Sequence, residues 1–232
     1  MLHYVWLIIF IYVQNHMEAS MKIRLVIAIS CLILLFHCIV LGEEPNPCSQ
    51  DDALAAAQKL WVTFNESHTI ASLHSMYGFS SKEDVLSCEL RNGYQVVLVD
   101  YDSYEQGDDI LKYIDTSLQG AYQCAFGFGV YLDNQQCGDI RVGFRQGEWT
   151  FMACGGYGEL EKEGRYNVIF EKYPASAGYS IYSDLFNRFF IIKNATVISS
   201  FAISPGKKAV YVEKDPELFM LENKARIKAA KD

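Results

Sequence analysis

The chain has 232 residues, of which 50% are hydrophobic, and a formal net charge of -8. This length and composition allow a full hydrophobic core, so we expect one domain after the removal of a leader. The acidic balance argues against nucleic acid and anionic lipid as main partners, because both bind to basic surfaces. A small ligand or another extracellular protein remains as a possible partner.

The first 42 residues have the pattern of a secretory leader. Met21 is followed by two basic residues and then by an apolar run at 25–41, and small residues precede Glu43. This pattern predicts a signal peptide that is cleaved after Gly42, which would make the mature protein extracellular. The apolar run upstream of Met21 is shorter than the roughly 20 residues that a helix needs to cross a bilayer.

Two questions about this leader stay open. Translation could begin at Met1 or at Met21, and residues 25–41 could remain as an uncleaved membrane anchor, for which their length is barely sufficient. With cleavage, the chain consists of an upstream extension and signal peptide at 1–42 and a single secreted α+β domain at 43–232.

The mature part begins with a predicted helix and continues mostly as strands. Asp51 or Asp52 is a candidate N-cap for a helix that ends at about Leu60, and whose inner face includes Leu54 and Ala57. Segments rich in β-branched and aromatic residues then predict seven strands, at 93–101, 121–132, 139–145, 148–154, 165–173, 189–203 and 208–214.

Short polar links and two further helices complete the pattern. The links at 145–148 and 204–208 are typical of turns between paired strands. Apolar residues at helical spacing predict one internal helix at 107–119. A C-terminal helix is expected after Asp215, a natural N-cap, with Pro216 at its first position. The fold class is therefore α+β and β-rich, with a mainly antiparallel sheet that is barrel-like or a sandwich.

Five cysteines remain after the predicted cleavage. In an oxidising compartment we expect two disulfides and one thiol left over, which could join two chains. The sequence leaves the pairing open among Cys48, Cys88, Cys124, Cys137 and Cys154. A metal site is the alternative use of cysteine, but there is no C-x-x-C motif, and no metal or other cofactor is expected. Two sequons predict glycosylation at Asn65 and Asn194.

The segment at 122–132 alternates like a strand with two very different faces. One face carries bulky residues such as Phe126 and Phe128, while the other carries Ala125, Gly127 and Gly129. A bare face allows either close packing of a helix or close approach of a ligand to the backbone. The second interpretation predicts an apolar cavity within a closed sheet. Phe126, Phe128 or Tyr131 would contribute side chains to the wall of this cavity.

Catalytic and metal motifs are weak. The acidic stretch at 100–109 begins like a calcium loop, but Glu105 stands at the required glycine and Leu111 at the bidentate glutamate, which indicates a solvated loop. The sequence at 178–182 lacks the last glycine of a nucleophile elbow. No catalytic residue is assigned, although paired carboxylates could act in a hydrolase.

Two partial resemblances to known families remain. "KLWVTF" around Trp61, followed by strands and a late helix, resembles a lipocalin, with Lys59 in place of the usual glycine. "NATV" followed by "DPELFMLENKARIKA" is similar to the end of the actin-depolymerising homology domain. Neither motif is specific, and no family is assigned. The signal peptide, the series of strands and the bare strand face together predict a secreted, lipocalin-like carrier of an apolar small molecule. The alternatives are an interaction module that binds another protein and a carboxylate-based hydrolase.

Overall fold

The computed structural model describes residues 48–156, 166–204 and 210–231. The predicted leader at 1–42, with its cleavage site and the alternative anchor at 25–41, lies outside these residues, as does most of the link at 204–208. The described α-helices are α3 (Gln50–Glu66), α4 (Ile70–Tyr77), α5 (Glu83–Ser87), α6 (Asn167–Lys172) and α7 (Pro216–Lys231), and the short 3-10 helices are η1 (Ile110–Tyr113), η2 (Leu118–Gly120) and η4 (Ala175–Ala177). The described strands are β1 (Glu89–Val99), β2 (Ile114–Asp115), β3 (Cys124–Leu132), β4 (Gln135–Arg145), β5 (Glu148–Gly156), β6 (Ser180–Asp184), β7 (Phe189–Lys193), β8 (Thr196–Ser204) and β9 (Val210–Lys214).

The strands form one mixed, nine-stranded sheet in the order β5-β4-β3-β1-β6-β7-β8-β9, with the short β2 beside β1. The pair β1–β6 is parallel, from Gln95 opposite Tyr182 to Val97 opposite Asp184, and the other pairs are antiparallel. Because β5 and β9 are the two ends of this order, the sheet is open. The α+β class is confirmed, but the expected barrel or sandwich is wrong.

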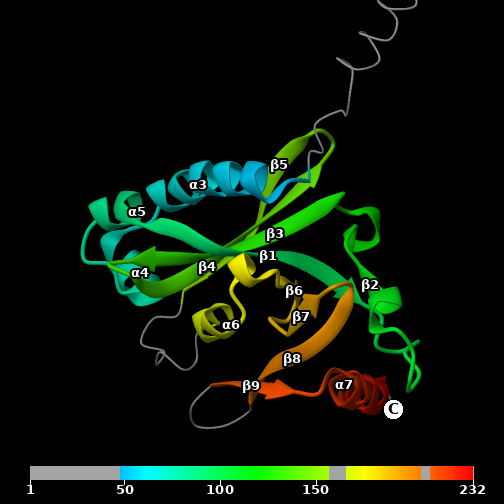
Figure 1. Cartoon of the computed structure of the whole chain (residues 1–232). Coiled ribbons are helices and arrows are strands. Elements are labelled where there is room, and N and C mark those ends of the chain that lie inside the picture. Colours follow the sequence, from blue (N-terminus) through cyan, green and yellow to red (C-terminus); the bar gives the residue numbers. More distant parts are fainter. Residues whose placement is uncertain (1–47, 157–165, 205–209, 232) are drawn as a thin grey trace, which may run out of the picture. The chain divides into compact units, whose positions relative to one another are not determined.

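Helices pack on both faces of the sheet (Figure 1). Helix α3 lies along one face of β1, β3 and β4, while α6 lies on the opposite face, in the bend that the sheet makes toward β8 and β9. Ala53, Ala57 and Trp61 of α3 join the core formed with β3 and β4. Ile169 and Phe170 of α6 join the core inside the bend. Helix α7 covers β7 and β8 from outside through Phe219 and Met220, which pack near Phe190.

Helix α3 contains the predicted range but begins earlier. Ser49 is the N-cap, and its hydroxyl accepts a hydrogen bond from the Asp52 amide at 3.1 Å. A serine side chain in this position satisfies an amide that has no partner within the helix, and the two aspartates then favour the positive end of the helix dipole. Of the expected inner face, Ala57 is fully buried beside Ala53 and Trp61, whereas Leu54 is only partly buried against the same core.

The predicted internal helix at 107–119 is wrong. Ile114 and Asp115 pair instead with Leu98 and Val99 as β2, between the single 3-10 turns η1 and η2. The Asp115 carboxylate accepts hydrogen bonds from the amides of Ser117 and Gln119, which holds a turn. Short polar side chains of this kind compete with helical hydrogen bonding, and here they prevail over the apolar spacing.

The segment at 165–173, predicted as a strand, contains α6. Tyr166, Ile169 and Phe170 recur at helical spacing and all enter the core inside the bend. The prediction also missed α4, α5 and β6. The remaining predicted strands correspond to β1, β3, β4, β5, β7, β8 and β9, with the single segment at 189–203 forming both β7 and β8. The C-terminal helix is present, and Asp215 Oδ1 accepts from the Leu218 amide at 3.0 Å.

Candidate functional site

The bare face of β3 is filled by aromatic side chains. A Cβ atom at Gly127 would lie 2.2 Å from Cζ of Tyr94, and one at Gly129 would lie 2.8 Å from the Tyr131 ring. Tyr94 comes from β1, directly opposite Gly127 in the ladder. The glycines therefore make room for tyrosine rings, and the close approach that the sequence indicated is that of neighbouring side chains together with α6.

The predicted cavity residues do not converge on one space. Phe126 and Phe128 point to the opposite face of β3, where they are buried with α3. Tyr131 is also buried, and its hydroxyl accepts a hydrogen bond from Asn92 Nδ2. Burial raises the pKa of Tyr131 to about 12, so the phenol stays protonated at neutral pH. Phe126 lines the larger of the two pockets described below, while Phe128 and Tyr131 line neither of these two.

A buried polar cluster accompanies the tyrosines. Asp139 and Arg141 alternate along β4 opposite Gly129 and Gly127, with side-chain atoms 3.8 Å apart. Arg141 donates from Nε to the Tyr94 hydroxyl at 3.4 Å and from Nη1 to the carbonyl of Leu185 at 3.2 Å. These bonds tie the centre of the sheet to the β6–β7 turn, which is how a buried guanidinium is accommodated.

The Asp139 carboxyl is the most perturbed acid of this cluster. Burial raises its pKa to about 6, and the charge of Arg141 and the hydrogen bond with Tyr94 only partly oppose this effect. A carboxyl that titrates near neutral pH is a candidate proton donor or acceptor. Asp139 is only 8% exposed, however, and the two pockets described below are lined by other residues. We therefore assign it a structural role in the described fold.

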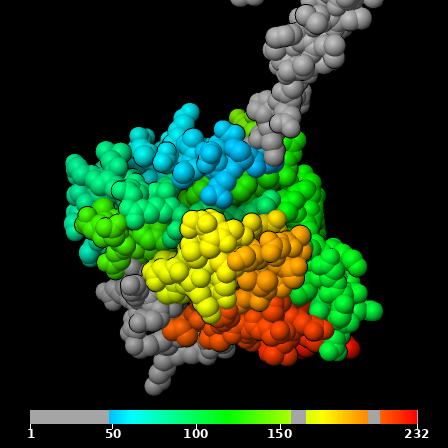
Figure 2. All heavy atoms as spheres, viewed as in Figure 1, coloured from blue at the N-terminus to red at the C-terminus, as the bar shows by residue number. Residues whose placement is uncertain are grey.

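The candidate binding site is a pocket of about 500 Å³ where β6 joins β1. In Figure 2, the segment that holds α6 and the start of β6 lies at the surface below the first turns of α3. We call this space the β1–β6 pocket, and its walls are formed by Gln50, Asn92, Gly93, Gln95, Phe126, Phe170, Pro174, Ala175, Tyr179, Ser180, Ile181 and Tyr182.

The sheet topology creates this pocket. Within β1, only Gln95–Val97 pair with β6. The first half of β1 therefore has β3 as its only strand partner among the described residues. A bulge between Arg91 and Tyr94 further displaces the edge of β1. This pocket could not be predicted from the sequence, because β6 was not predicted and a parallel pair of strands that are distant in sequence leaves no local pattern.

The lining combines rings and amides. Phe126, Phe170, Tyr179 and Tyr182 supply aromatic surface, and the side chains of Gln50, Asn92 and Gln95 supply hydrogen-bond donors and acceptors. Among the described residues that line the pocket there is no lysine, arginine, aspartate or glutamate. Its volume and its mixed walls match the usual character of small-molecule sites, which are mainly apolar with a few polar groups.

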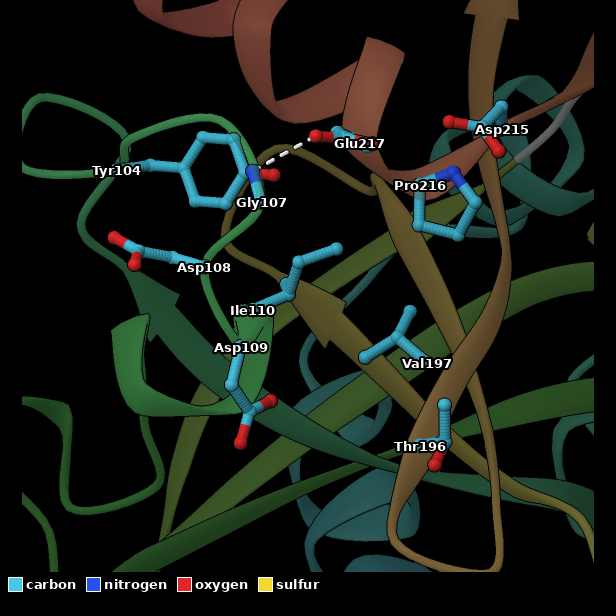
Figure 3. A pocket seen from close by; sticks show the side chains of 10 residues that line it. All are labelled: Tyr104, Gly107, Asp108, Asp109, Ile110, Thr196, Val197, Asp215, Pro216 and Glu217. Atoms are coloured by element: carbon cyan, nitrogen blue, oxygen red, sulfur yellow. Dashed lines mark hydrogen bonds between the residues drawn. The ribbon is translucent and has the colours of Figure 1, made fainter.

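A second pocket of about 300 Å³ lies between the acidic loop and α7 (Figure 3). Four carboxylates surround it, but they lie apart and each has a local role. Glu217 accepts from the Gly107 amide at 2.8 Å, and Asp108 accepts from the Tyr113 hydroxyl. Asp109 and Asp215 accept from backbone amides at the starts of η1 and α7. Within the described residues, no group of three or more His, Cys, Asp or Glu side chains could hold a metal ion.

The predicted modification sites differ in their surroundings. Cys48 and Cys124 form a disulfide, which joins the segment before α3 to β3. Asn194 is exposed in the turn between β7 and β8. Asn65 is only 1% exposed, and its Nδ2 donates to the carbonyl of Trp61 at 2.9 Å. The structure therefore favours Asn194 over Asn65 as a glycan acceptor, because a glycan attaches to this amide nitrogen and must extend into solvent.

The β6–β7 turn presents apolar side chains to solvent. Phe186 is 77% exposed and Leu185 is 44% exposed. The turn beneath them is held firmly, because Asp184 accepts hydrogen bonds from the amides of Phe186 and Arg188 and from the Tyr101 hydroxyl. A fixed backbone with exposed apolar side chains is a feature of protein-binding surfaces.

Comparisons with known proteins give no further guidance. No protein-family model, no curated protein and no solved structure matches the chain. In the part of the chain that the structure describes, no helix is both long and apolar enough to pass through a membrane.

Proposed function

We propose that the protein is a secreted, disulfide-bonded glycoprotein that binds an amphipathic small molecule in the β1–β6 pocket. The observation that carries this proposal is the pocket itself, which combines a volume of about 500 Å³ with aromatic and amide walls. Compared with the carrier expected from the sequence, the ligand site moves from the interior of a closed sheet to the junction of β1 and β6.

The chemistry of the walls specifies the kind of ligand. An apolar or aromatic part would pack against Phe126, Phe170 and Tyr179, because burying apolar surface stabilises a complex. A neutral polar part would pair with the amides of Gln50, Asn92 and Gln95, since a buried amide without a partner costs free energy. The described lining residues carry no charged side chains, which disfavours a highly charged ligand.

A blocking variant with a matched control tests the proposal. Ala175 lines the pocket and Ala177 does not, although both are exposed on the same turn, η4. We expect Ala175→Trp to fill the pocket and Ala177→Trp to leave it open. Native mass spectrometry of protein secreted from eukaryotic cells should show an extra mass of a few hundred daltons for the wild type and for Ala177→Trp, but not for Ala175→Trp.

Fluorescence of 1-anilinonaphthalene-8-sulfonate supplies a second measurement that does not need a co-purified ligand. We expect the folded wild type and Ala177→Trp to bind this amphipathic probe at least tenfold more tightly than Ala175→Trp. Equal binding by all three proteins, or no probe binding and no extra mass for the wild type, would contradict the proposal. Circular dichroism must show that both variants are folded.

A protein-binding role is the second candidate, and the exposed Phe186 is the observation that favours it. If this role is correct, native spectra should show a protein-sized partner whose binding is lost in Phe186→Ser. Leu86→Ser is the control, because Leu86 is 68% exposed on a different surface and its replacement should retain the partner. A carboxylate-based hydrolase is the least supported role, since the four acids around the second pocket lie apart and serve the local backbone and Tyr113.

A further inference from the structure

The structure brings two further cysteines together. Cys88 is the last residue before β1 and caps the end of α5, while Cys137 lies in β4. Cys137 is buried in a core cluster against which Cys88 packs, and the two thiols interact with each other. We propose that Cys88 and Cys137 form a second disulfide, which leaves Cys154 as the one remaining thiol among the described residues.

Local geometry explains how residues from separate strands meet. In the β3–β4 ladder, Val130 pairs with Gly138 and Tyr131 pairs with Gln136, so Cys137 is the extra residue of a bulge. Its thiol lies 3.3 Å from the carbonyl of Val130, which belongs to the strand between β4 and β1. The bulge thus places the Cys137 thiol against β3 at Val130, which pairs on its other side with Leu90, two residues after Cys88.

Cys88 is placed to complete the bond. Strand β1 begins at Glu89, so the Cys88 backbone lies outside the ladder and follows a helix of only five residues. Its thiol donates to the carbonyl of Asp84 at 3.1 Å, a contact that oxidation would replace. The sulfurs must approach to about 2.05 Å in a disulfide, and a residue outside the ladder can make that adjustment with little disturbance of the sheet.

The proposed pairing also has a structural logic. Cys48 lies directly before α3 and is bonded to β3, while Cys88 lies directly after α5 and would be bonded to the adjacent β4. The two bonds would therefore fasten both ends of the segment α3–α5 to neighbouring strands. Cys154 packs against the same core cluster from β5, where its sulfur accepts a hydrogen bond from the Tyr77 hydroxyl at 3.2 Å.

The reaction needs a disulfide oxidant, for which glutathione disulfide is the probe. The Cys88 thiolate attacks one sulfur of glutathione disulfide, forming a mixed disulfide and releasing one glutathione thiolate. The Cys137 sulfur then attacks the Cys88 sulfur and releases the second glutathione. Two thiol protons go to solvent, and two electrons pass from the cysteine pair to the oxidant. The interaction with Cys137 and burial raise the pKa of Cys88, so the reaction should be faster in alkaline buffer.

Disulfide mapping of the full chain tests the pairing. The reduced protein is reoxidised with glutathione disulfide at pH 8.5, blocked with N-ethylmaleimide and digested without reduction. We expect mass spectrometry to detect one cross-linked peptide with Cys48 and Cys124 and another with Cys88 and Cys137. In the mature part of the chain, only Cys154 should carry the maleimide.

Two variants test which cysteines are paired. Cys88→Ser should convert Cys137 from unlabelled to fully labelled, while Cys154→Ser should retain both cross-links. Maleimide on both Cys88 and Cys137 in the reoxidised wild type, or a cross-link between Cys137 and Cys154, would overturn the proposal. The mapping of the wild type decides the question even if a variant fails to fold, and it is independent of ligand binding in the β1–β6 pocket.

Discussion

At the scale of single residues, Asp139 shows how the sheet accommodates a charge. Its carboxyl lies between strands, where a Cβ atom at Gly155 would be only 2.9 Å from Oδ1. Arg141 offers a counter-charge, but removal from water has the larger effect on the pKa of Asp139. The glycines around this pair thus leave room for both the tyrosine rings and the carboxylate.

The raised pKa of Asp139 predicts a specific pH dependence of stability. The pKa rises from an ordinary 3.8 to about 6, so the native state binds more protons than the unfolded chain between these values. The contribution of Asp139 to stability is therefore complete below pH 3.8 and is lost as the pH rises through 6. A difference of two pKa units corresponds to about 3 kcal/mol.

Urea unfolding of the wild type and Asp139→Asn between pH 4 and pH 8 measures this effect. We expect the free energy of unfolding of the wild type, relative to the variant, to fall by about 2.5 kcal/mol across this range. Glu213→Gln is a control of opposite sign. Burial would raise the pKa of Glu213, but hydrogen bonds from Lys172, Ser199 and Tyr173 lower it to about 2. Its contribution is present above pH 4.5 and is lost as the pH falls toward 2, so the unfolding series of this control extends down to pH 2. A constant difference for Asp139→Asn would show that its pKa is not raised.

The residues around Asp139 also show which features of the sheet can be predicted from the sequence and which cannot. The alternation at 122–132 identified the strand and its bare face, because these properties depend on neighbouring residues in the chain. What fills the face depends on Tyr94, which is brought opposite Gly127 by strand pairing. Pairing across the sheet has no local pattern, so the sequence could not distinguish a cavity from a packed ring.

At the scale of elements, local signals succeeded where they agreed with the tertiary contacts. Strands β3, β4 and β5 alternate clearly and were predicted, as was the turn that contains Gln146 and Gly147, both with positive φ. The segment at 165–173 has the composition of a strand, but its apolar residues fit the bend of the sheet only when helical spacing gathers them on one side. Composition alone could not decide between the two-residue period of a strand and the roughly 3.6-residue period of a helix.

Helix α7 provides an element whose start can be tested. Asp215 Oδ1 accepts from the Leu218 amide at 3.0 Å, and α7 is fixed through the buried Phe219 and Met220. Loss of an N-cap side chain costs about 1 kcal/mol, because a backbone amide loses its acceptor. We expect Asp215→Ala to lower the free energy of unfolding by this amount in urea titrations. Asp215→Asn retains a capping oxygen and should remain within about 0.5 kcal/mol of the wild type; equal losses in both variants would instead indicate a role for the charge.

At the scale of the whole molecule, the open sheet follows from one connection. The chain leaves β5 at the edge of the sheet and returns as β6 beside β1, in parallel. This connection passes through α6, divides the sheet into two antiparallel parts and leaves the first half of β1 beside the candidate pocket. The sequence supported many strands and short links, but it contained no signal for this return, and the strands were therefore expected to close or to form two sheets.

The disulfide between Cys48 and Cys124 joins the segment before α3 to β3. We expect removal of this bond to have a large effect on stability. The bonded residues are separated by 76 positions, so the cross-link restricts a long part of the unfolded chain. Chain-entropy arguments give a stabilisation of about 4 kcal/mol for a loop of this size. We expect the double variant Cys48→Ala with Cys124→Ala to lose about this amount in urea unfolding. Some of the loss will come from the buried Cys124 side chain, which packs in the core beside α3.

Two measurements separate the cross-link from the packing. Without the bond the unfolded chain expands and exposes more surface, so the dependence of the unfolding free energy on urea should become steeper, which the loss of a side chain alone would not cause. Cys154→Ser is the control, because Cys154 lies outside the bond and its replacement should leave this slope unchanged. A double variant with the wild-type slope and a loss below about 1 kcal/mol would mean that this bond does not constrain the unfolded chain. The stability of the molecule would then depend on the packing of α3, α6 and α7 against the two faces of the open sheet.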